Sequence, residues 1–519
     1  MFVATSAFLA YHVLHRTILC TLAKIPGPRI FALTSWRLAI EDFKGSRTRK
    51  IQEIHVKYGP VVRIGPREVS FNSLSALRKI YGAGSGFERT DFYRMFDVYG
   101  KENMFTFGPV QQHAERKKML SHAYSKSSMI KGEQAAMIQD KARQYMQLLE
   151  SEPGSTSEMF STLHFFSLDA ITDFVYGKYG STQAVSGSQG DRALLNDILD
   201  PARRKLSWFA VHFPAFTKWL YTRVNLMERL VKPLLPMKKP LTYTGIRTHA
   251  LQAWQQFYRE AKQNWSKCTS NHVMGLLWSH HKNQGGSLDD LDIASECADH
   301  LLAGIDTTSD TLMFLTWALS LTRNRRFQDK LAEEVSSISE EACDDFGVPT
   351  PEACASLPYL DAIIKETLRV YAPLPASEPR VLRQDINIDG YMIPADTVVS
   401  MEPYSLHRNA EIFEEPLEFN PDRWLGDGKK VAEMKKWWWA FSSGGRMCIG
   451  MHLAMAEMTT LVSAIYRKYI TNVRPGSENK TPAITSRFEM FYDESFEEIE
   501  DSSFKEIRSR DVSDYKYSV

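Results

Sequence analysis

The sequence predicts a mainly α-helical protein with small β-sheets, built as a single large domain behind an apolar N-terminal segment. The chain has 519 residues, of which 43% are hydrophobic, and this is enough to form a large core. The apolar run over residues 290–322 contains no proline and predicts one long helix that crosses the protein interior. We find no internal repeat, low-complexity block or long linker that would divide the chain further.

Residues 1–23 are largely apolar and predict an N-terminal transmembrane anchor, because a helix needs about 20 apolar residues to cross a bilayer. His12, His15 and Arg16 interrupt this run, so a helix that lies on the membrane surface is the alternative. A cleaved signal peptide is disfavoured because no basic run precedes the apolar stretch. Lys24 follows the segment and predicts that the main body lies on the cytosolic side.

A proline-rich hinge over residues 24–30 should connect this anchor to the main domain, which we expect over residues 31–493. Pro26 and Pro28 in the hinge fix φ and end any preceding helix. Residues 494–519 are acidic and polar, and they predict a loose C-terminal tail.

Short strands and further helices complete the expected domain. Residues 61–64 and 68–71 flank a Gly-Pro turn and predict a β-hairpin, and residues 381–400 predict short strands joined by turns. After the long helix, further helices are expected over residues 325–340, 358–371 and 450–468.

Charge and cysteine content exclude several classes of protein. The formal net charge is +1, so no global basic field indicates a nucleic-acid partner. The six cysteines are scattered and form no CxxC pair, which argues against a disulfide framework and against a zinc site. A reducing compartment therefore suits the main domain.

The most informative motif is a ten-residue loop with the pattern Phe-x-x-Gly-x-Arg-x-Cys-x-Gly, which runs from Phe441 to Gly450. Gly444 allows a tight backbone turn beside a flat ligand, and Gly450 allows the following helix to begin close to the same ligand. The positive end of that helix would stabilise the Cys448 thiolate, which is then suited to be the axial ligand of a haem iron. Phe441 would cover the sulfur and Arg446 would neutralise a haem propionate. The alternative is a small buried cysteine without a ligand.

This loop resembles the haem-binding loop of the cytochrome P450 family and matches it at every position. The resemblance implies the cytochrome P450 fold, haem b ligated through Cys448, and insertion of one oxygen atom of O2 into a substrate. The chain contains no flavin or nicotinamide domain, so the electrons should come from a separate NADPH-cytochrome P450 reductase, with cytochrome b5 as a further donor.

Residues 303–308 (Ala-Gly-Ile-Asp-Thr-Thr) lie within the long helix and resemble the oxygen-activating segment of the same family. Ala303 and Gly304 would leave room for a ligand against one face of the helix. Thr307 would hold a hydrogen-bonded water exposed by a local opening of the helix, and Asp306 would relay protons to it. The alternative is a mid-helix glycine among solvent-facing polar side chains.

Glu366 and Arg369 are three residues apart on one helix face, a spacing that is typical of a weak surface ion pair. The segment over residues 419–424 resembles the family segment that supplies a second arginine, here Arg423. The resemblance implies that the three residues form a buried structural triad behind the haem.

His113 and Lys117 occupy the family positions that face the haem propionates, where the family often has Trp and Arg. Both can still donate hydrogen bonds, and Arg116 is expected to share the task. Arg380 matches a further propionate-binding position.

By family analogy, the loop over residues 92–107 caps a pocket for a small apolar substrate. The residues expected to line the pocket are Phe96, Phe105, Leu374, Ala376, Phe488 and the haem-facing Ala303. Several segments resemble microsomal members from filamentous fungi, which tailor terpenoids, polyketides or alkaloids. This resemblance implies a single-pass enzyme of the endoplasmic reticulum membrane that acts in secondary-metabolite biosynthesis.

Four lysines precede the cysteine loop and predict either a solvated face or a docking patch for an acidic reductase. These lysines are Lys429, Lys430, Lys435 and Lys436. Two rival functions use the same haem, namely an isomerase or dehydratase that does not use O2 and a non-catalytic haem-binding protein. The intact Asp306-Thr307 pair disfavours both.

Overall fold

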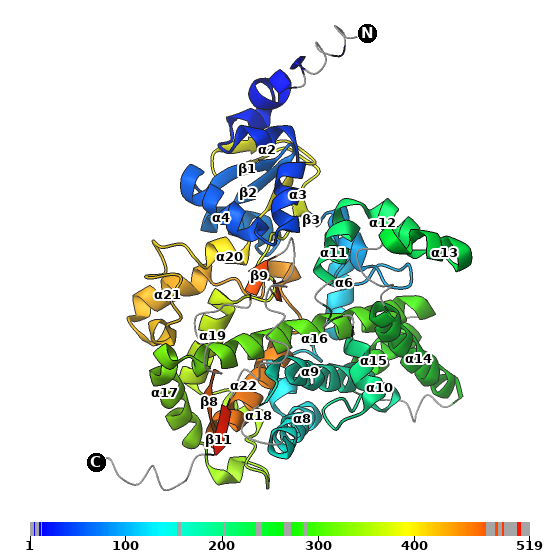
Figure 1. Ribbon diagram of the computed structural model, residues 1–519, viewed down its shortest axis with the longest axis vertical. Helices are drawn as coiled ribbons and strands as arrows, with labels where there is room; N and C mark the ends of the chain where they lie inside the picture. The colour runs from blue at the N-terminus through cyan, green and yellow to red at the C-terminus, as the bar shows by residue number, and fades with distance from the viewer. Residues whose placement is uncertain are drawn as a thin grey trace.

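The computed structural model divides into a small sheet-containing end and a larger helical body, and Figure 1 shows the long helix α16 (Asp290–Ser320) crossing that body. The structure describes residues 5, 10–11, 13–152, 157–196, 198, 200, 203–234, 241–263, 271–283, 288–473, 483–485, 490–492 and 506–509. The other long helices of the body are α6 (Val110–Leu120), α8 (Gly132–Ser151), α9 (Met159–Tyr176), α14 (Leu241–Gln263), α15 (Val273–Asn283), α17 (Arg325–Ser336), α19 (Pro358–Val370) and α22 (Met451–Lys468).

Shorter helices surround this body and the sheet. They are α2 (Arg29–Leu33), α3 (Trp36–Phe43), α4 (Arg47–Tyr58), α5 (Leu74–Tyr81), α7 (Lys126–Ile130), α10 (Gln189–Arg192), α11 (Arg203–His212), α12 (Pro214–Tyr221), α13 (Asn225–Val231), α18 (Pro351–Cys354), α20 (Pro403–Leu406) and α21 (Gly428–Trp437). The helices expected over residues 325–340, 358–371 and 450–468 are present as α17, α19 and α22, with ends shifted by a few residues at most.

Helix α16 begins where the sequence predicts and ends two residues earlier. Its first turn is capped in both directions, because the Asp289 side chain accepts a hydrogen bond from the Asp292 backbone N–H and the Asp292 side chain accepts one from the Asp289 N–H. It packs most extensively against α9, and together with α8, α17, α19 and α22 it encloses the largest hydrophobic core. The helix therefore forms a rigid wall through the centre of the body.

Gly304 marks the point at which α16 and α9 come into close contact. A Cβ atom at this position would lie 2.5 Å from Cγ1 of Ile171, which no real side chain tolerates. The glycine is therefore required by the packing of two helices, and it also lines the cavity beside which the sequence predicted it.

The main sheet has five strands in the order β1-β2-β7-β4-β3. Its strands are β1 (Val61–Gly65), β2 (Glu68–Phe71), β3 (Glu88–Arg89), β4 (Arg380–Val381) and β7 (Val398–Ser400). The β1–β2 hairpin confirms the prediction for residues 61–71. The short antiparallel pair β3–β4 places Arg89 opposite Arg380. This register brings two arginines from distant parts of the chain to one place at the edge of the sheet.

Three two-stranded sheets complete the fold. They pair β5 (Ile386–Ile388) with β6 (Tyr391–Ile393), β9 (Ala483–Thr485) with β10 (Met490–Tyr492), and β8 (Tyr469–Asn472) with β11 (Glu506–Ser509). The last pair differs from the expectation of a loose tail, because Glu506 to Ser509 pair in register with β8.

The N-terminal segment differs from the expected straight anchor where the structure describes it. A π-helical turn (His15–Leu19) is followed by extended Cys20 and a 3-10 turn (Thr21–Lys24). Leu22 is buried in the core beside the sheet, and Arg63 donates a hydrogen bond to the Arg16 carbonyl at 2.7 Å. The end of the expected anchor therefore belongs to the domain. Among the described residues, no helix combines the length and the apolar character needed to cross a membrane.

Candidate functional site: a cavity above Cys448

A cavity of about 230 Å³ lies between α16, the cysteine loop and the loops that follow β3 and α19. Most of its lining is apolar. The sequence-predicted site residues that line it are Ala303, Thr307, Phe105, His113, Lys117, Leu374, Ala376, Phe441, Arg446, Cys448 and Gly450. Sequence motifs from four separate segments therefore meet in one place.

Cys448 faces this cavity, which is why its side chain is accessible although it lies deep in the protein. Its backbone N–H donates to the Phe441 carbonyl at 2.9 Å and closes the loop. Burial raises the pKa of the Cys448 thiol, while the backbone N–H groups of Gly450 and Met451 and the charge of Lys117 oppose this shift. These donors would stabilise a thiolate that ligates a metal at this position.

Gly444 and Gly450, the two glycines of the loop motif, have different surroundings. Gly444 has a φ of +63°, and an added Cβ would lie 2.3 Å from the Tyr81 carbonyl oxygen, so it is required by contact with backbone rather than with a ligand. A Cβ at Gly450 would meet Cys448 Sγ at 3.9 Å, which is ordinary van der Waals contact.

Five basic side chains gather at one side of the cavity, and we call them the basic cluster. Four of them line the cavity, namely Arg89, His113, Lys117 and Arg446, and the fifth, Arg380, lies outside the lining and opposite Arg89 in the β3–β4 pair. Burial and the charges of Arg89 and Arg380 lower the pKa of Arg446 to about 9. Burial and the neighbouring positive charges, that of Arg446 first, lower the pKa of His113 to about 2, so its imidazole is neutral.

The basic cluster contains more cationic side chains than carboxylates that pair with them. Arg380 is bound by Glu378 at 3.0 Å and donates to the Tyr93 hydroxyl at 2.7 Å. Arg446 donates to the carbonyls of Phe107 and Gly108, at 2.9 and 2.7 Å, and no carboxylate of the described residues forms an ion pair with it. The Nε atoms of Arg89 and Arg446 are buried without a hydrogen-bond partner. Buried cations of this kind are stable only when an anion completes them, and the two propionates of haem are suitable anions.

Lys117 is placed differently from the expectation that it donates to a propionate. Its Nζ donates to the carbonyls of Gly445 and Met447, at 3.0 and 2.6 Å. It therefore ties α6 to the cysteine loop. Burial lowers the pKa of Lys117, and the nearby Cys448 opposes this shift.

On the opposite wall, Ala303 and Thr307 lie one turn apart on α16 and face the cavity. The Thr307 hydroxyl donates to the Ala303 carbonyl at 2.8 Å, and α16 is continuous here. The local helix opening that the sequence suggested is therefore not present. The hydroxyl oxygen retains lone pairs that can accept a further hydrogen bond from the cavity side.

Asp306, by contrast, is absent from the cavity lining. Its carboxylate pairs with Arg203 of α11 at 2.6 Å and lies 4.0 Å from Nε2 of buried His164 of α9. Asp306 and Thr307 are thus on different faces of the helix, and the proton relay between them stays a prediction.

Helix α22 carries a buried acid, Glu457, that was not predicted from the sequence. Glu457 of α22 lines the cavity and is hydrogen-bonded to Thr308. Burial raises the pKa of Glu457 to about 8, and the hydrogen bond opposes this shift. A lone acid in the apolar run of α22 was the available signal in the sequence.

The predicted triad residues lie together, with Glu366 and Arg369 fully buried and Arg423 partly buried. Arg369 binds Glu366 through two hydrogen bonds of 2.9 and 2.8 Å, and Arg423 Nε donates to the same carboxylate at 3.1 Å. Trp424 and the Asn420 backbone N–H add two donors, each at 2.9 Å. The hydrogen bonds outweigh burial, which would raise the pKa, so the pKa of Glu366 is lowered and the acid is ionised.

The expected substrate residues separate into two groups. Phe105, Leu374 and Ala376 line the cavity, whereas Phe96 packs behind Phe105 with ring centroids 5.3 Å apart. Phe488 lies outside the described residues.

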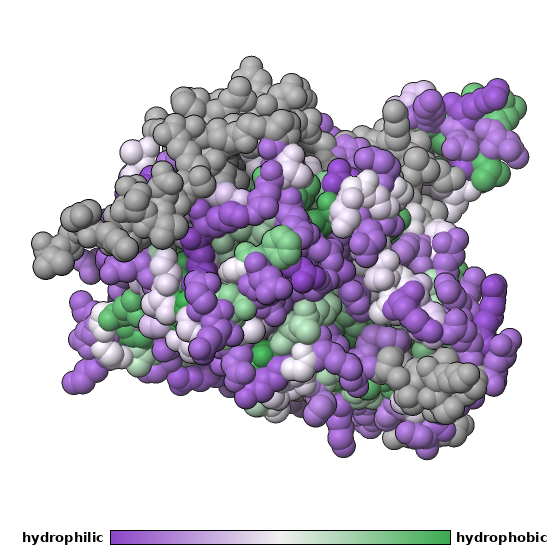
Figure 2. All heavy atoms as spheres, turned by 90° about the horizontal axis from the view of Figure 1, so that it is seen from below, coloured by the Kyte–Doolittle hydropathy of each residue, from purple (hydrophilic) through white to green (hydrophobic). Residues whose placement is uncertain are grey.

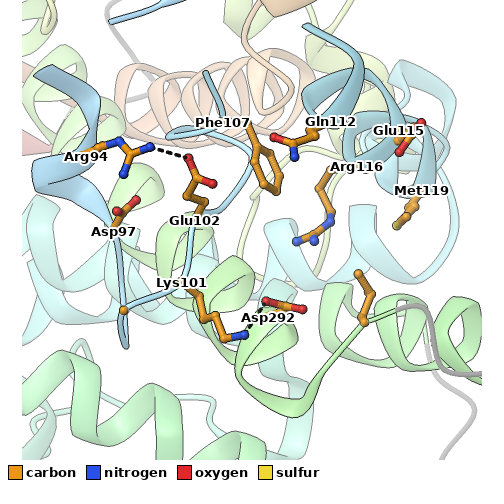
Figure 3. A pocket seen from close by; sticks show the side chains of 12 residues that line it. Arg94, Asp97, Lys101, Glu102, Phe107, Gln112, Glu115, Arg116, Met119 and Asp292 are labelled. Carbon is orange, nitrogen blue, oxygen red and sulfur yellow. Dashed lines mark ion pairs between the residues drawn. The ribbon is translucent and has the colours of Figure 1, made fainter. Parts of the chain in front are cut away.

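Arg116 faces away from the basic cluster. It binds Glu296 of α16, and its guanidinium lies over the Phe107 ring. Figure 3 shows Arg116 and Phe107 next to each other among the side chains that line a second, more polar cleft of about 560 Å³. Two ion pairs cross its entrance, Arg94–Glu102 at 3.9 Å and Lys101–Asp292 at 3.4 Å. The cleft therefore carries acidic and basic side chains together, whereas the cavity has mainly basic side chains at one side.

Arg89 is the other functional residue that the sequence reasoning missed. Its guanidinium lies 4.5 Å from the Phe105 ring centroid and donates to the carbonyls of Met104 and Phe105. Burial and the charge of Arg380 lower the pKa of Arg89 to about 10. No local motif marks Arg89, because its partner Arg380 comes from a distant part of the chain.

Comparison with known proteins agrees with this geometry. The family model for Cytochrome P450 matches residues 26–492. The chain is 28% identical to Cytochrome P450 monooxygenase stcB of Emericella nidulans over 86% of this chain and 82% of the relative. It is 26% identical to Cytochrome P450 monooxygenase orf2 of Aspergillus niger over 88% of each chain. The thiol at the base of the cavity, the basic cluster beside it and the extent of the family match agree, and the chain belongs to the cytochrome P450 family as a monooxygenase.

Proposed function

We propose that this monooxygenase inserts one oxygen atom of O2 into an apolar small molecule as a tailoring step of fungal secondary metabolism. The position of the Cys448 thiol in a mostly apolar cavity, with Thr307 on the wall of the same cavity, is the observation that carries this proposal. The fungal relatives support the biological setting. When haem b is bound here, it supplies the activation of O2 and the oxygen transfer.

The residues of the chain then have separable tasks. The Cys448 thiolate would ligate the haem iron, and Arg89, Arg380 and Arg446 would hold the propionates with neutral His113 beside them. Thr307 Oγ1 accepts a hydrogen bond from the cavity side, because its own proton is donated to the Ala303 carbonyl. Asp306 exchanges protons on the opposite face, where Arg203 and His164 surround its carboxylate.

The test of this function is a carbon monoxide spectrum of the reduced protein followed by turnover with NADPH and purified reductase. We expect the red-shifted Soret band of thiolate ligation, and NADPH consumption that depends on substrate. Cys448→Ala should abolish both. A wild-type spectrum without the shifted band, or unchanged turnover in Cys448→Ala, would contradict the assignment.

We propose that a separate NADPH-cytochrome P450 reductase docks at α21, with cytochrome b5 as a further donor. Four exposed lysines on this helix support the docking site, and α21 leads directly into the cysteine loop. They are Lys429, Lys430, Lys435 and Lys436. Reversing the charges of Lys435 and Lys436 should slow turnover with reductase and leave turnover with peroxide unchanged. Equal losses in both assays would exclude docking at this site.

The enzyme is also proposed to attach to the endoplasmic reticulum membrane by its N-terminal end. Helices α12 and α13 expose large apolar side chains, including Trp219, Leu226 and Leu230. Trp208 of the preceding helix binds the Ala39 carbonyl of α3 at 2.8 Å, so these helices lie on the same side as the N-terminal segment. The opposite end of the molecule is mainly hydrophilic (Figure 2).

Sedimentation with microsomes tests this attachment. A chain that lacks residues 1–23 and carries Leu226→Ser and Leu230→Ser should remain in the supernatant while the full chain pellets. Pelleting of the altered chain to the same extent would contradict the proposal.

A further inference from the structure

The α16 wall of the cavity carries one acidic side chain that the proposed reaction does not use. Asp299 lies one helical turn before Ala303 and two turns before Thr307, and all three residues line the cavity. The rise of an α-helix is about 1.5 Å per residue, so Asp299 lies about 12 Å along the helix from Thr307.

Asp299 differs from the two other acids that line the cavity. Glu378 binds Arg380 at 3.0 Å, and Glu457 is hydrogen-bonded to Thr308. Across the described part of the chain, no cation comes within ion-pair distance of the Asp299 carboxylate. The backbone N–H of Phe105, on the loop that covers the cavity, favours the charged form of this carboxylate and donates to Asn103 Oδ1 at 3.1 Å.

The charged groups that face Asp299 are His300, Glu296 and Arg89. Glu296 is already bound by Arg116, and its other carboxylate oxygen lies 3.3 Å from His300 Nε2. Arg89 belongs to the basic cluster, so its charge is shared with the propionates. Burial raises the pKa of Asp299 to about 7, which agrees with a carboxyl group whose charge is poorly compensated.

An acid that faces a mostly apolar cavity without a cation partner costs free energy, and a ligand that supplies a hydrogen-bond donor lowers that cost. We propose that Asp299 determines substrate specificity by binding a hydrogen-bond donor on the substrate, a protonated amine or a hydroxyl, about 12 Å from the oxidised position. This inference rests on the proposed function and narrows its substrate class. The substrate is then an apolar scaffold with one polar end, held lengthwise along α16.

The test uses three ligands of one shape, namely a biphenyl that carries an N-methylpiperidine, a methylcyclohexane or a cyclohexanol ring. Binding to the holoenzyme is followed by the shift of the haem Soret band. We expect the amine or the alcohol to bind the wild type roughly 10- to 150-fold more tightly than the hydrocarbon, because a hydrogen bond to a charged group contributes about 1.5–3 kcal/mol. Comparison of the amine with the alcohol shows which donor the site takes.

Asp299→Asn separates this role from a structural one, because asparagine has nearly the same size and shape and keeps an acceptor oxygen but carries no charge. The variant should lose the preference for the polar ligand and bind the hydrocarbon as the wild type does. Asp299→Glu should restore part of the preference. Asp310→Asn, on the same helix near His164 and outside the cavity lining, is the matched control and should behave as the wild type.

A wild type that binds the polar ligands no better than the hydrocarbon, including no spectral change with any of them, contradicts the inference. Equal loss of all three ligands in Asp299→Asn would show that the residue only positions the loop. The carbon monoxide spectrum of each protein is recorded in parallel. A normal spectrum with no polar preference refutes the role of Asp299 alone, whereas an unshifted band in the wild type refutes the proposed function.

Discussion

The Glu366 cluster and the basic cluster are both buried, and they differ in how their charges are balanced. Glu366 receives five hydrogen bonds from Arg369, Arg423, Trp424 and the Asn420 backbone, so acid and base are matched within the protein. The basic cluster leaves two guanidinium Nε atoms without partners. A buried cluster whose acidic and basic charges are matched stabilises the fold, whereas one with excess positive charge is suited to bind an anionic ligand.

The largest expected effect is on the balanced cluster. Glu366→Gln leaves two buried arginines without an anion and should lower the free energy of unfolding by about 3–5 kcal/mol, measured by urea denaturation. The matched control is Glu433→Gln, because Glu433 binds Lys436 at 2.6 Å with the same spacing in sequence but on the surface. The control should unfold as the wild type does. Similar losses in both variants would contradict the assignment of a structural role to burial and balance.

Glu457 tests the effect of an unmatched buried charge directly, because it is a buried acid without a cation partner among the described residues. Its pKa is about 8 in the folded protein against 4.5 for a free glutamate, so the folded state holds the proton more tightly. The free energy of unfolding should therefore fall as pH rises from about 4.5 to about 8, by at most about 1.4 kcal/mol per pH unit. Glu457→Gln removes this slope, while Glu402, whose pKa burial also raises to about 8, contributes equally to both proteins.

Urea denaturation across this pH range measures the effect. The stability of Glu457→Gln relative to the wild type should increase with pH. A difference that stays constant with pH would show that the acid is compensated in the folded protein.

The smallest expected effect is at the basic cluster. Arg446→Gln should speed the loss of haem about tenfold, because one charge-assisted hydrogen bond to a propionate is removed. Transfer of haem to excess apomyoglobin measures this rate. Arg192→Gln is the control, since Arg192 also donates to two backbone carbonyls but lies outside the cavity lining. An unchanged rate in Arg446→Gln would remove Arg446 from the haem site.

Local motifs predicted much of the site, because their residues are close in the sequence. The cysteine loop and the Glu366–Arg369 spacing belong to this group. Arg89 could not be predicted, since the β3–β4 pairing that brings it to Arg380 is two residues long and joins distant segments. The sequence placed Arg116 beside Lys117 in one role, but successive helical residues point about 100° apart, and only the packing of α6 decides which one faces the cavity.

The fold shows the same limit. Helix lengths follow from apolar periodicity and capping, so α16 and the β1–β2 hairpin were predictable. The residue that packs against Gly304 was not predictable, because a glycine in a sequence indicates only that a side chain does not fit there. In this protein Ile171 fills that space. The course of residues 15–24 also depended on tertiary contacts, since an apolar segment packs on a domain as readily as it enters a membrane.

The contact between Gly304 and Ile171 constrains how this enzyme can evolve. Ile171 packs against one helix and also lines the cavity, so one side chain serves both fold and substrate fit. A larger residue at this position has no room on the helix side. A smaller one relieves the contact and widens the cavity. New substrates that need more space can therefore be reached by single substitutions at Ile171, whereas a narrower cavity must be built from another wall.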